Sequence, residues 1–346
     1  MYVVEREIRA QFDALQQTVD YLTEKQAEIT GFLAGAERLL YLGSGSSFCI
    51  AKSGAAQFSQ RLGVPANAMA AGDLLVNFNA YRKSIAGATL VVLSRSGSTT
   101  ELLEAIALCK AADPSTKVLS ITTVLENPLT KVSDLNLVLP WANDVAICQT
   151  RTVSNLYLTS LMLAAFAEGS EATLTEARAI LDVAKTYTEE LEPHIKAISN
   201  QPWNHAVVLA DSGMAGLAEE GALAFKEICR VNSNHYFILD SRHGPVVMVD
   251  ENTFVAIALT NGNAALQDAL VADIRKRTPH VLVMGSAGEA SSQDGITRLP
   301  YPEGITQDDT RAIFFLWALQ MVTFHHALWR GVDPDKPEGL NAWIAL

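Results

Sequence analysis

Short apolar runs alternate with longer amphipathic segments along most of the chain. An apolar run of four to six residues bounded by polar or glycine-rich turns is typical of a buried strand, and a three- to four-residue apolar spacing is typical of a helix. Strands that alternate with helices predict an α/β fold whose parallel sheet is covered on both faces. The expected strands are residues 38–43, 89–94, 117–122, 135–140, 205–210, 235–239, 254–259 and 280–284.

The pattern of strand, small-residue turn and helix starts twice, which indicates two domains. With a length of 346 residues and roughly 150 residues per domain, two doubly wound, three-layer α/β/α domains of the flavodoxin-like type fit in tandem. Helices are expected at 47–62, 99–112, 150–168, 171–199, 214–231 and 307–330. The predicted organisation is an N-terminal helix over 1–34, a first domain over 35–168, a bridging helix over 169–199, and a second domain with a C-terminal tail over 200–346.

Two of the expected strands end in clusters of serine, threonine and glycine, "SGSSF" at 44–48 and "SRSGSTTE" at 94–101. In open α/β sheets ligands bind beyond the carboxyl ends of the strands, where helix N-termini present N–H groups to an anion. Helix capping by serine or threonine is the alternative for either cluster, but two clusters together favour a phosphate monoester. The candidate binding residues are Gly45, Ser46, Ser47, Ser94, Arg95, Ser96, Gly97, Ser98 and Thr99.

Composition and the absence of competing motifs exclude several classes of ligand. A net charge of −12 argues against a nucleic-acid partner, which requires a basic surface. The pair Gly43 and Gly45 is followed by Phe48, so the dinucleotide fingerprint is incomplete, and no phosphate-loop lysine motif occurs. We therefore expect no cofactor.

The remaining composition indicates a cytoplasmic protein. The four cysteines have no metal-ligand spacing and are expected to be buried thiols in a reducing compartment, with no metal bound. The N-terminus has no leader pattern, and no apolar run reaches about 18 residues, so no membrane contact is expected.

These segments resemble the SIS (sugar isomerase) domain family, and the second half resembles a second SIS domain through "EEGALAFKEI" at 219–228 and "RHGPVVMVDENT" at 242–253. The chain is similar to the isomerase half of glucosamine-6-phosphate synthase and to stand-alone phosphosugar isomerases, deaminases and deglycases. The glutaminase half of the synthase is not expected, because Met1 is followed by Tyr2 and not by a nucleophilic cysteine.

The resemblance implies particular catalytic residues. Glu227 matches the glutamate that transfers the proton, and a carboxylate partly withdrawn from water is a better base near neutral pH. A solvated helix glutamate is the alternative. His243 matches the histidine that opens the sugar ring from a neighbouring subunit, which implies a homodimer with shared sites; a backbone-capped turn histidine is the alternative.

The segment "NDVAICQTRTVSNLYL" at 143–158 resembles the family's helix entry, where backbone groups meet the sugar. Ile147 and Cys148 are then the candidate sugar contacts. Arg151 either contacts substrate or pairs with a carboxylate, and the sequence does not distinguish the two.

The chain departs from the synthase pattern at two lysines. Ala224 and Ala342 stand where the synthase carries lysine, and Lys226 points about 100° away from Glu227 on a helix. Synthase activity is therefore not expected. The predicted function is a phosphosugar isomerase or deaminase that moves a proton between C1 and C2 of a hexose or amino-hexose 6-phosphate. A deglycase of a phosphorylated fructosamine and a non-catalytic sugar-phosphate sensor are the alternatives.

Overall fold

The structure is a computed structural model that describes residues 1–285 and 288–340. Contacts divide these residues into two units. The first-sheet unit contains residues 10–145 and 149–177, and the second-sheet unit contains residues 1–9, 146–148 and 178–340.

The first-sheet unit contains a parallel sheet with the strand order β2-β1-β3-β4-β5. The order reverses between β1 and β3, as in doubly wound flavodoxin-like folds. Its strands are β1 (Leu39–Gly43), β2 (Ala66–Ala70), β3 (Thr89–Leu93), β4 (Val118–Thr122) and β5 (Leu135–Val138). Its helices are α2 (Gln11–Glu24), α3 (Gln26–Leu33), α4 (Ser46–Leu62), α5 (Ala71–Val76), α6 (Phe78–Ile85), α7 (Thr100–Ala112) and α8 (Arg151–Glu168), followed by the start of α9 (Glu171–Ser199).

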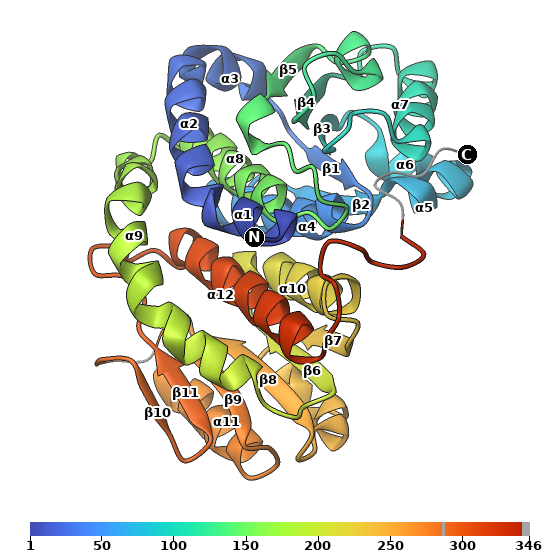
Figure 1. The fold of residues 1–346 in the computed structure, drawn as a ribbon. Coiled ribbons are helices and arrows are strands. Elements are labelled where there is room, and N and C mark those ends of the chain that lie inside the picture. Colours follow the sequence, from blue (N-terminus) through green and yellow to red (C-terminus); the bar gives the residue numbers. More distant parts are fainter. Residues whose placement is uncertain (286–287, 341–346) are drawn as a thin grey trace. The chain divides into compact units, whose positions relative to one another are not determined.

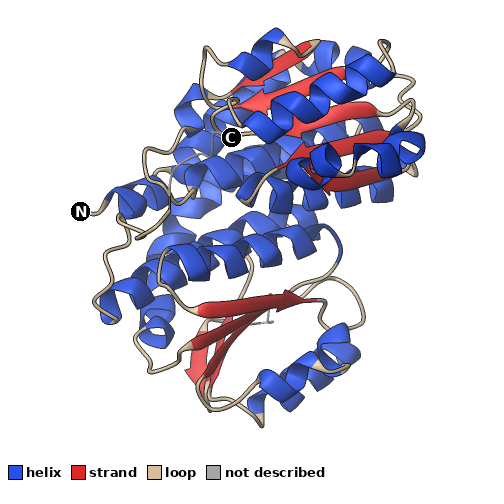
Figure 2. Cartoon of the chain, turned by 90° about the vertical axis from the view of Figure 1, so that its right-hand side faces the viewer, coloured by secondary structure: helices blue, strands red, loops and turns tan. Residues whose placement is uncertain are grey.

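Strands β1, β3 and β4 are buried along their whole length because helices cover both faces of the sheet (Figure 2). On one face, Leu42 and Val92 pack against α5 and α7. Helix α4 packs on β1, β2 and β3 and also contacts α8. Burial on both faces removes the polar alternation of a half-exposed strand, which explains why these strands read as continuous apolar runs.

The second-sheet unit repeats this strand order. Its sheet has the order β10-β11-β9-β8-β6-β7, in which the parallel strands β7, β6, β8, β9 and β11 correspond to the order 2-1-3-4-5 and β10 adds an antiparallel edge. The strands are β6 (His205–Leu209), β7 (Asn232–Tyr236), β8 (Thr253–Ala258), β9 (His280–Met284), β10 (Ser291–Gln293) and β11 (Ile296–Leu299).

Helices cover both faces of this second sheet (Figure 1). Helix α11 packs on one face, and α10 and α12 lie on the other. The helices of the unit are α1 (Val3–Arg9), the larger part of α9, α10 (Ala215–Glu227), α11 (Ala264–Arg275) and α12 (Asp308–Trp329). The predicted α/β fold with two sheets is confirmed.

Helix α12 is long and apolar enough to cross a membrane by length and composition alone. Most of its apolar window is buried inside the protein, however. Burial in the core is sufficient reason for that composition.

Several local predictions were wrong. The single helix expected over 1–34 is three helices, because the chain breaks at Ala10 and again at Lys25, where ψ is 0° and 3°. The helix expected over 214–231 ends at Glu227, and the strand expected at 235–239 is β7 at Asn232–Tyr236. The strands and helices not foreseen are β2, β10, β11, α5, α6 and α11.

A candidate phosphate site at the carboxyl ends of the first sheet

The two serine-rich clusters follow neighbouring strands of the first sheet. Strands β1 and β3 pair in parallel, with Leu42 opposite Val92, so both strands end at the same edge. This edge is the point where the strand order reverses, and ligands of doubly wound folds bind there. The fold therefore brings the two predicted loops, residues 44–47 and 94–99, to one place.

The loop after β1 leads directly into α4 because two glycines allow a tight turn. A Cβ on Gly43 would lie 2.5 Å from the backbone carbonyl atoms of Ser47. Gly45 has a φ of 56° and is the residue that precedes α4, so no side chain caps this helix at that position. Ser46 and Ser47 lie in the first turn, only 6 and 4% exposed. The capping alternative is therefore not what this cluster does.

The loop after β3 is held by its own hydroxyl groups. Ser94 Oγ accepts a hydrogen bond from the Gly97 N–H at 3.0 Å, and Ser96 Oγ accepts one from the Ser98 N–H at 3.2 Å. A hydroxyl that accepts such a bond still carries its own proton. Thr99 precedes α7 and, within the described part of the chain, its side chain forms no cap hydrogen bond.

Exposure differs along this loop. Ser98 is exposed, Ser96 and Thr99 are half-buried, and Ser94 is buried. Arg95 is only 7% exposed and supplies a cation within the loop. The accessible hydroxyl groups and the N-terminus of α7 form a surface that suits an anion.

Polar residues after β4 and β5 complete the surroundings of this loop, and sequence reasoning missed them. Asn127 lies against Gly97, where a Cβ would come within 2.1 Å of Asn127 Oδ1. Thr123 donates its N–H to the Arg95 carbonyl oxygen at 3.1 Å. The run "TTVLEN" at 122–127 was the available signal, since polar residues again follow a buried strand.

The corresponding edge of the second sheet is filled by carboxylates of the chain itself. Both carboxylate oxygens of Asp308 accept from the Asn261 N–H, at 3.1 and 3.0 Å, and Arg311 binds Asn261 Oδ1 at 2.7 Å. Burial raises the pKa of Asp308 above its usual value. Asp211, after β6, accepts the Ile238 N–H at 2.8 Å. Internal carboxylates therefore accept two of the backbone N–H groups near this edge, those of Asn261 and Ile238.

The predicted base and ring-opening histidine lie in the second-sheet unit. Glu227 is the last residue of α10 and is half-buried, with Ala224 buried on the turn before it. Lys226 is exposed and donates to the Ala222 carbonyl oxygen. His243 is exposed in a turn between two 3-10 segments. The catalytic roles of Glu227 and His243 stay predictions.

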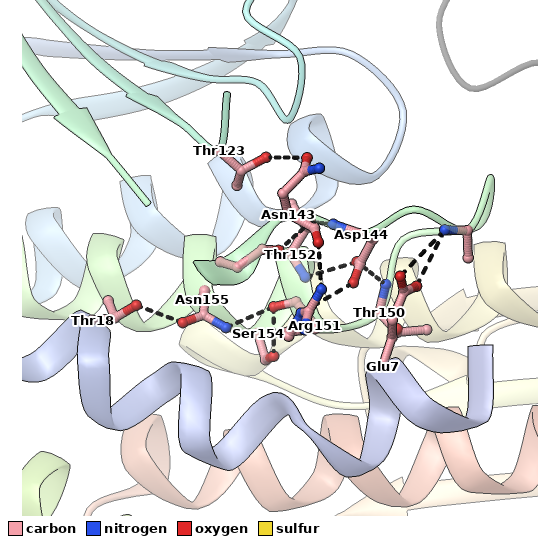
Figure 3. Close-up of polar contacts among 12 residues, drawn as sticks. Glu7, Thr18, Thr123, Asn143, Asp144, Thr150, Arg151, Thr152, Ser154 and Asn155 are labelled. Atoms are coloured by element: carbon pink, nitrogen blue, oxygen red, sulfur yellow. Dashed lines mark hydrogen bonds and ion pairs between the residues drawn. The ribbon is translucent and has the colours of Figure 1, made fainter. Parts of the chain in front are cut away.

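Of the remaining candidates, Arg151 pairs with a carboxylate. Its Nε lies 3.6 Å from Asp144 Oδ1, and its Nη2 donates to the Asn143 carbonyl oxygen (Figure 3). Ile147 is half-buried and Cys148 is buried. These two residues group with the second-sheet unit, and their contact with sugar stays a prediction. Ala342 lies outside the described residues.

The cysteine predictions concern burial and metal binding. Cys49, Cys109, Cys148 and Cys229 are all buried and none forms a disulfide, which confirms the expectation of buried thiols. Across residues 1–285 and 288–340, no group of histidine, cysteine and carboxylate side chains is placed to hold a metal ion.

Part of the chain matches a known family model. Residues 32–168 match the family model of the SIS domain. The match covers the first sheet with both serine-rich loops. It ends before the second sheet, and a second SIS domain stays a prediction.

The relatives are phosphosugar enzymes. The chain is 27% identical to the glutamine–fructose-6-phosphate aminotransferase (isomerizing) of Aeropyrum pernix, over 99% of this chain and 57% of that protein. The chain thus spans less than three fifths of that relative's length.

Two solved structures share the fold. A glucosamine-6-phosphate deaminase from Thermotoga maritima aligns with a TM-score of 0.77 at 25% identity, covering 95% of this chain and 99% of the other. A tagatose-6-phosphate ketose/aldose isomerase from Escherichia coli aligns with a TM-score of 0.83 at 23% identity, covering 99% and 97%. The chain therefore shares its fold over nearly its whole length with both of these proteins.

Proposed function

We propose that the protein is an enzyme that isomerises or deaminates a hexose or amino-hexose 6-phosphate. The observation that carries the proposal is the pair of serine- and glycine-rich loops at the strand-order reversal of the first sheet. Backbone N–H groups, hydroxyl groups and the Arg95 side chain together suit a phosphate monoester. The resemblance to phosphosugar enzymes supports the same substrate class.

The proposed chemistry is proton transfer between C1 and C2 of the open-chain sugar, with Glu227 as the base. A half-buried carboxylate at a helix end can accept a proton and return it to the neighbouring carbon. His243 is proposed to assist ring opening, because an imidazole gains and loses a proton near neutral pH. No metal or cofactor takes part in this proposal.

We propose a homodimer in which His243 completes the site of the partner subunit. The turn that carries His243 exposes Phe237, Val247 and Met248 by 55, 73 and 64%. Large apolar side chains exposed together favour association. Burying them against a second copy would place His243 at the interface.

A complementation experiment tests the shared site. The Glu227→Gln and His243→Ala variants are each expected to be inactive. Mixed and re-equilibrated, they form heterodimers with one site that has both groups intact, so about a quarter of the wild-type activity returns. Sites built within one chain would give no recovery on mixing.

A deglycase that splits a phosphorylated fructosamine is the second candidate. Ala224 is buried one turn before Glu227, where the synthase has a lysine. A site without that amine cannot form a Schiff base there but retains the Glu227 carboxylate. Phosphorylated fructosamines therefore belong in the substrate panel.

The primary test is proton exchange in D₂O, followed by NMR at C1 and C2 of a panel of hexose and hexosamine 6-phosphates. Exchange that Glu227→Gln abolishes and the exposed matched control Glu251→Gln retains supports the proposal. If the wild-type protein binds a sugar phosphate but exchanges no proton at C1 or C2, the proposed catalysis is wrong. The alternative of a non-catalytic sugar-phosphate sensor would then be favoured.

A further inference from the structure

The Arg95 carbonyl oxygen is bound twice by Thr123, a residue of the loop that follows β4. The Thr123 N–H donates to this oxygen at 3.1 Å, and Thr123 Oγ1 lies 3.0 Å from it. Thr123 is itself buried. One residue therefore fixes the backbone of the loop 94–99 next to its cationic residue.

Thr123 is in turn fixed by Asn143, which follows β5. Thr123 Oγ1 lies 2.8 Å from Asn143 Oδ1 (Figure 3). Because a hydroxyl carries one proton, Oγ1 shares that proton between two acceptors, the Arg95 carbonyl oxygen and Asn143 Oδ1. Asn143 is held from its other side by Arg151, which donates to its carbonyl oxygen.

Asp144 anchors this arrangement to the start of α8. Its Oδ2 accepts the N–H groups of Thr150 and Thr152, both at 2.8 Å, and its own N–H donates to Thr152 Oγ1 at 3.2 Å (Figure 3). Burial raises the pKa of Asp144, while these N–H donors and Arg151 oppose that shift. Reciprocal bonds of this kind satisfy the unpaired N–H groups of a helix start.

We propose that Thr123 and Asn143 are positioning residues that hold the loop 94–99 in its phosphate-binding conformation. The proposal rests on the proposed function of that loop. The loop turns through Gly97 at a φ of 63°, and its own hydroxyl–backbone bonds span only two or three residues. A loop that is ordered before binding does not have to be ordered by the ligand.

Loss of the support that Thr123 and Asn143 give to the loop 94–99 is expected to weaken substrate binding and to leave the chemical step unchanged. Phosphate contacts are made equally in the ground state and the transition state, so their loss raises KM and leaves kcat unchanged. A structural defect that disturbed the whole unit would instead lower the fraction of active protein. The split between KM and kcat therefore distinguishes positioning from a general loss of stability.

The test uses Thr123→Val, which removes the hydroxyl and keeps the shape. We expect roughly 5- to 50-fold weaker binding of inorganic phosphate and of fructose 6-phosphate by calorimetry, with faster amide exchange at residues 94–99. Thr123→Ser restores the hydroxyl and should restore both. Thr159→Val is the matched control, because Thr159 Oγ1 is also buried and donates to a backbone oxygen, that of Asn155, within α8.

The outcomes separate the two proposals. If wild-type protein binds phosphate and Thr123→Val binds it equally well, the positioning role is wrong. If wild-type protein binds no phosphate, the proposed function is wrong, and unchanged exchange at residues 94–99 in Thr123→Val would overturn the positioning role independently. Should Thr123→Val not fold, Asn143→Leu removes the same support and is expected to weaken phosphate binding in the same direction.

Discussion

Gly97 combines two restrictions at one residue of the loop 94–99. Its φ of 63° is rarely adopted by residues with a side chain, and a Cβ would approach Asn127 Oδ1 to 2.1 Å. Asn127 cannot move away without losing the hydrogen bond that it accepts from the Thr130 N–H. The sequence "SRSGSTTE" shows the glycine but not the side chain that faces it.

We predict that Gly97→Ala lowers the melting temperature and weakens phosphate binding. Backbone strain costs about 1 kcal/mol, and displacement of Asn127 adds to it. Gly63→Ala is the matched control, since Gly63 has a φ of 67° and, among the described residues, an added Cβ meets open space. Differential scanning fluorimetry and phosphate titration measure both variants. Equal losses in the two would show that the contact with Asn127 has no effect.

His326 predicts a pH dependence of stability. Its ring stacks on Trp203, Nδ1 lies 2.7 Å from the Ser199 carbonyl oxygen, and burial lowers its pKa to about 4. The unfolded state then binds more protons than the folded state between that value and the usual pKa of about 6.5. Stability therefore decreases as the pH falls through this range.

The decrease is expected to be roughly 1 to 2 kcal/mol between pH 7 and pH 5. Urea unfolding at a series of pH values measures it. The His326→Phe variant keeps an aromatic ring without the titrating group, so its free energy of unfolding should be less sensitive to pH. Identical pH profiles for variant and wild type would contradict the assignment.

At the scale of elements, α4 approaches its neighbours at Gly54. A Cβ there would lie 2.7 Å from Tyr41 Cε1 in β1 and 3.0 Å from Ser160 Cβ in α8. The helix that opens with the serine-rich loop is thus seated by close contact with the strand and helix beside it. Glycine inside a helix has a low helix propensity, and this contact is the reason for it here.

We predict that Gly54→Ala destabilises the protein by about 1 to 3 kcal/mol, because overpacking outweighs the gain in helix propensity. Gly31→Ala in α3 is the matched control. An added Cβ at Gly31 contacts none of the described atoms within 4 Å, so this variant should gain about 0.5 to 1 kcal/mol. Chemical denaturation compares the two, and a stabilised Gly54→Ala would contradict the packing argument.

The same strand order occurs in both sheets of the molecule, but different residues lie at the two points where that order reverses. On the first sheet, hydroxyl groups and helix N-termini line the edge. On the second, Asp308 accepts from the Asn261 N–H and pairs with Arg311. An internal carboxylate there already accepts the Asn261 N–H, so the two repeats differ at their reversal points.

We predict that Asp308→Ala lowers stability by about 0.5 to 1.5 kcal/mol, because the exposed Asn261 N–H and the Arg311 cation lose their acceptor. Asp308→Asn retains an acceptor and should lose less. Phosphate affinity is expected to stay unchanged in both, measured by the same titration as for Thr123→Val. A loss of phosphate affinity comparable to that of Thr123→Val would place anion binding on the second sheet.

The local pattern of apolar and polar residues was enough to predict the strands that are buried along their whole length. Strands β1, β3 and β4 are apolar throughout because both faces are covered, and the serine-rich turns after β1 and β3 mark the reversal point. Edge strands such as β2 and β7 are half-exposed. Because these strands are partly polar, the sequence pattern did not predict β2 and predicted β7 at the wrong residues.

The sequence by itself determined the α/β class, the tandem arrangement of two sheets and the two serine-rich loops, because each depends on residues close together in the chain. Only the tertiary structure decided which distant residues support those loops. Thr123 and Asn127 contact the loop 94–99, and Asn143 contacts Thr123, because parallel pairing brings the ends of β3, β4 and β5 to one edge. The hydrogen bond from the Asn261 N–H to Asp308 likewise joins the start of α12 to the segment that follows β8. Such contacts depend on strand order and register, which local apolar patterns do not encode.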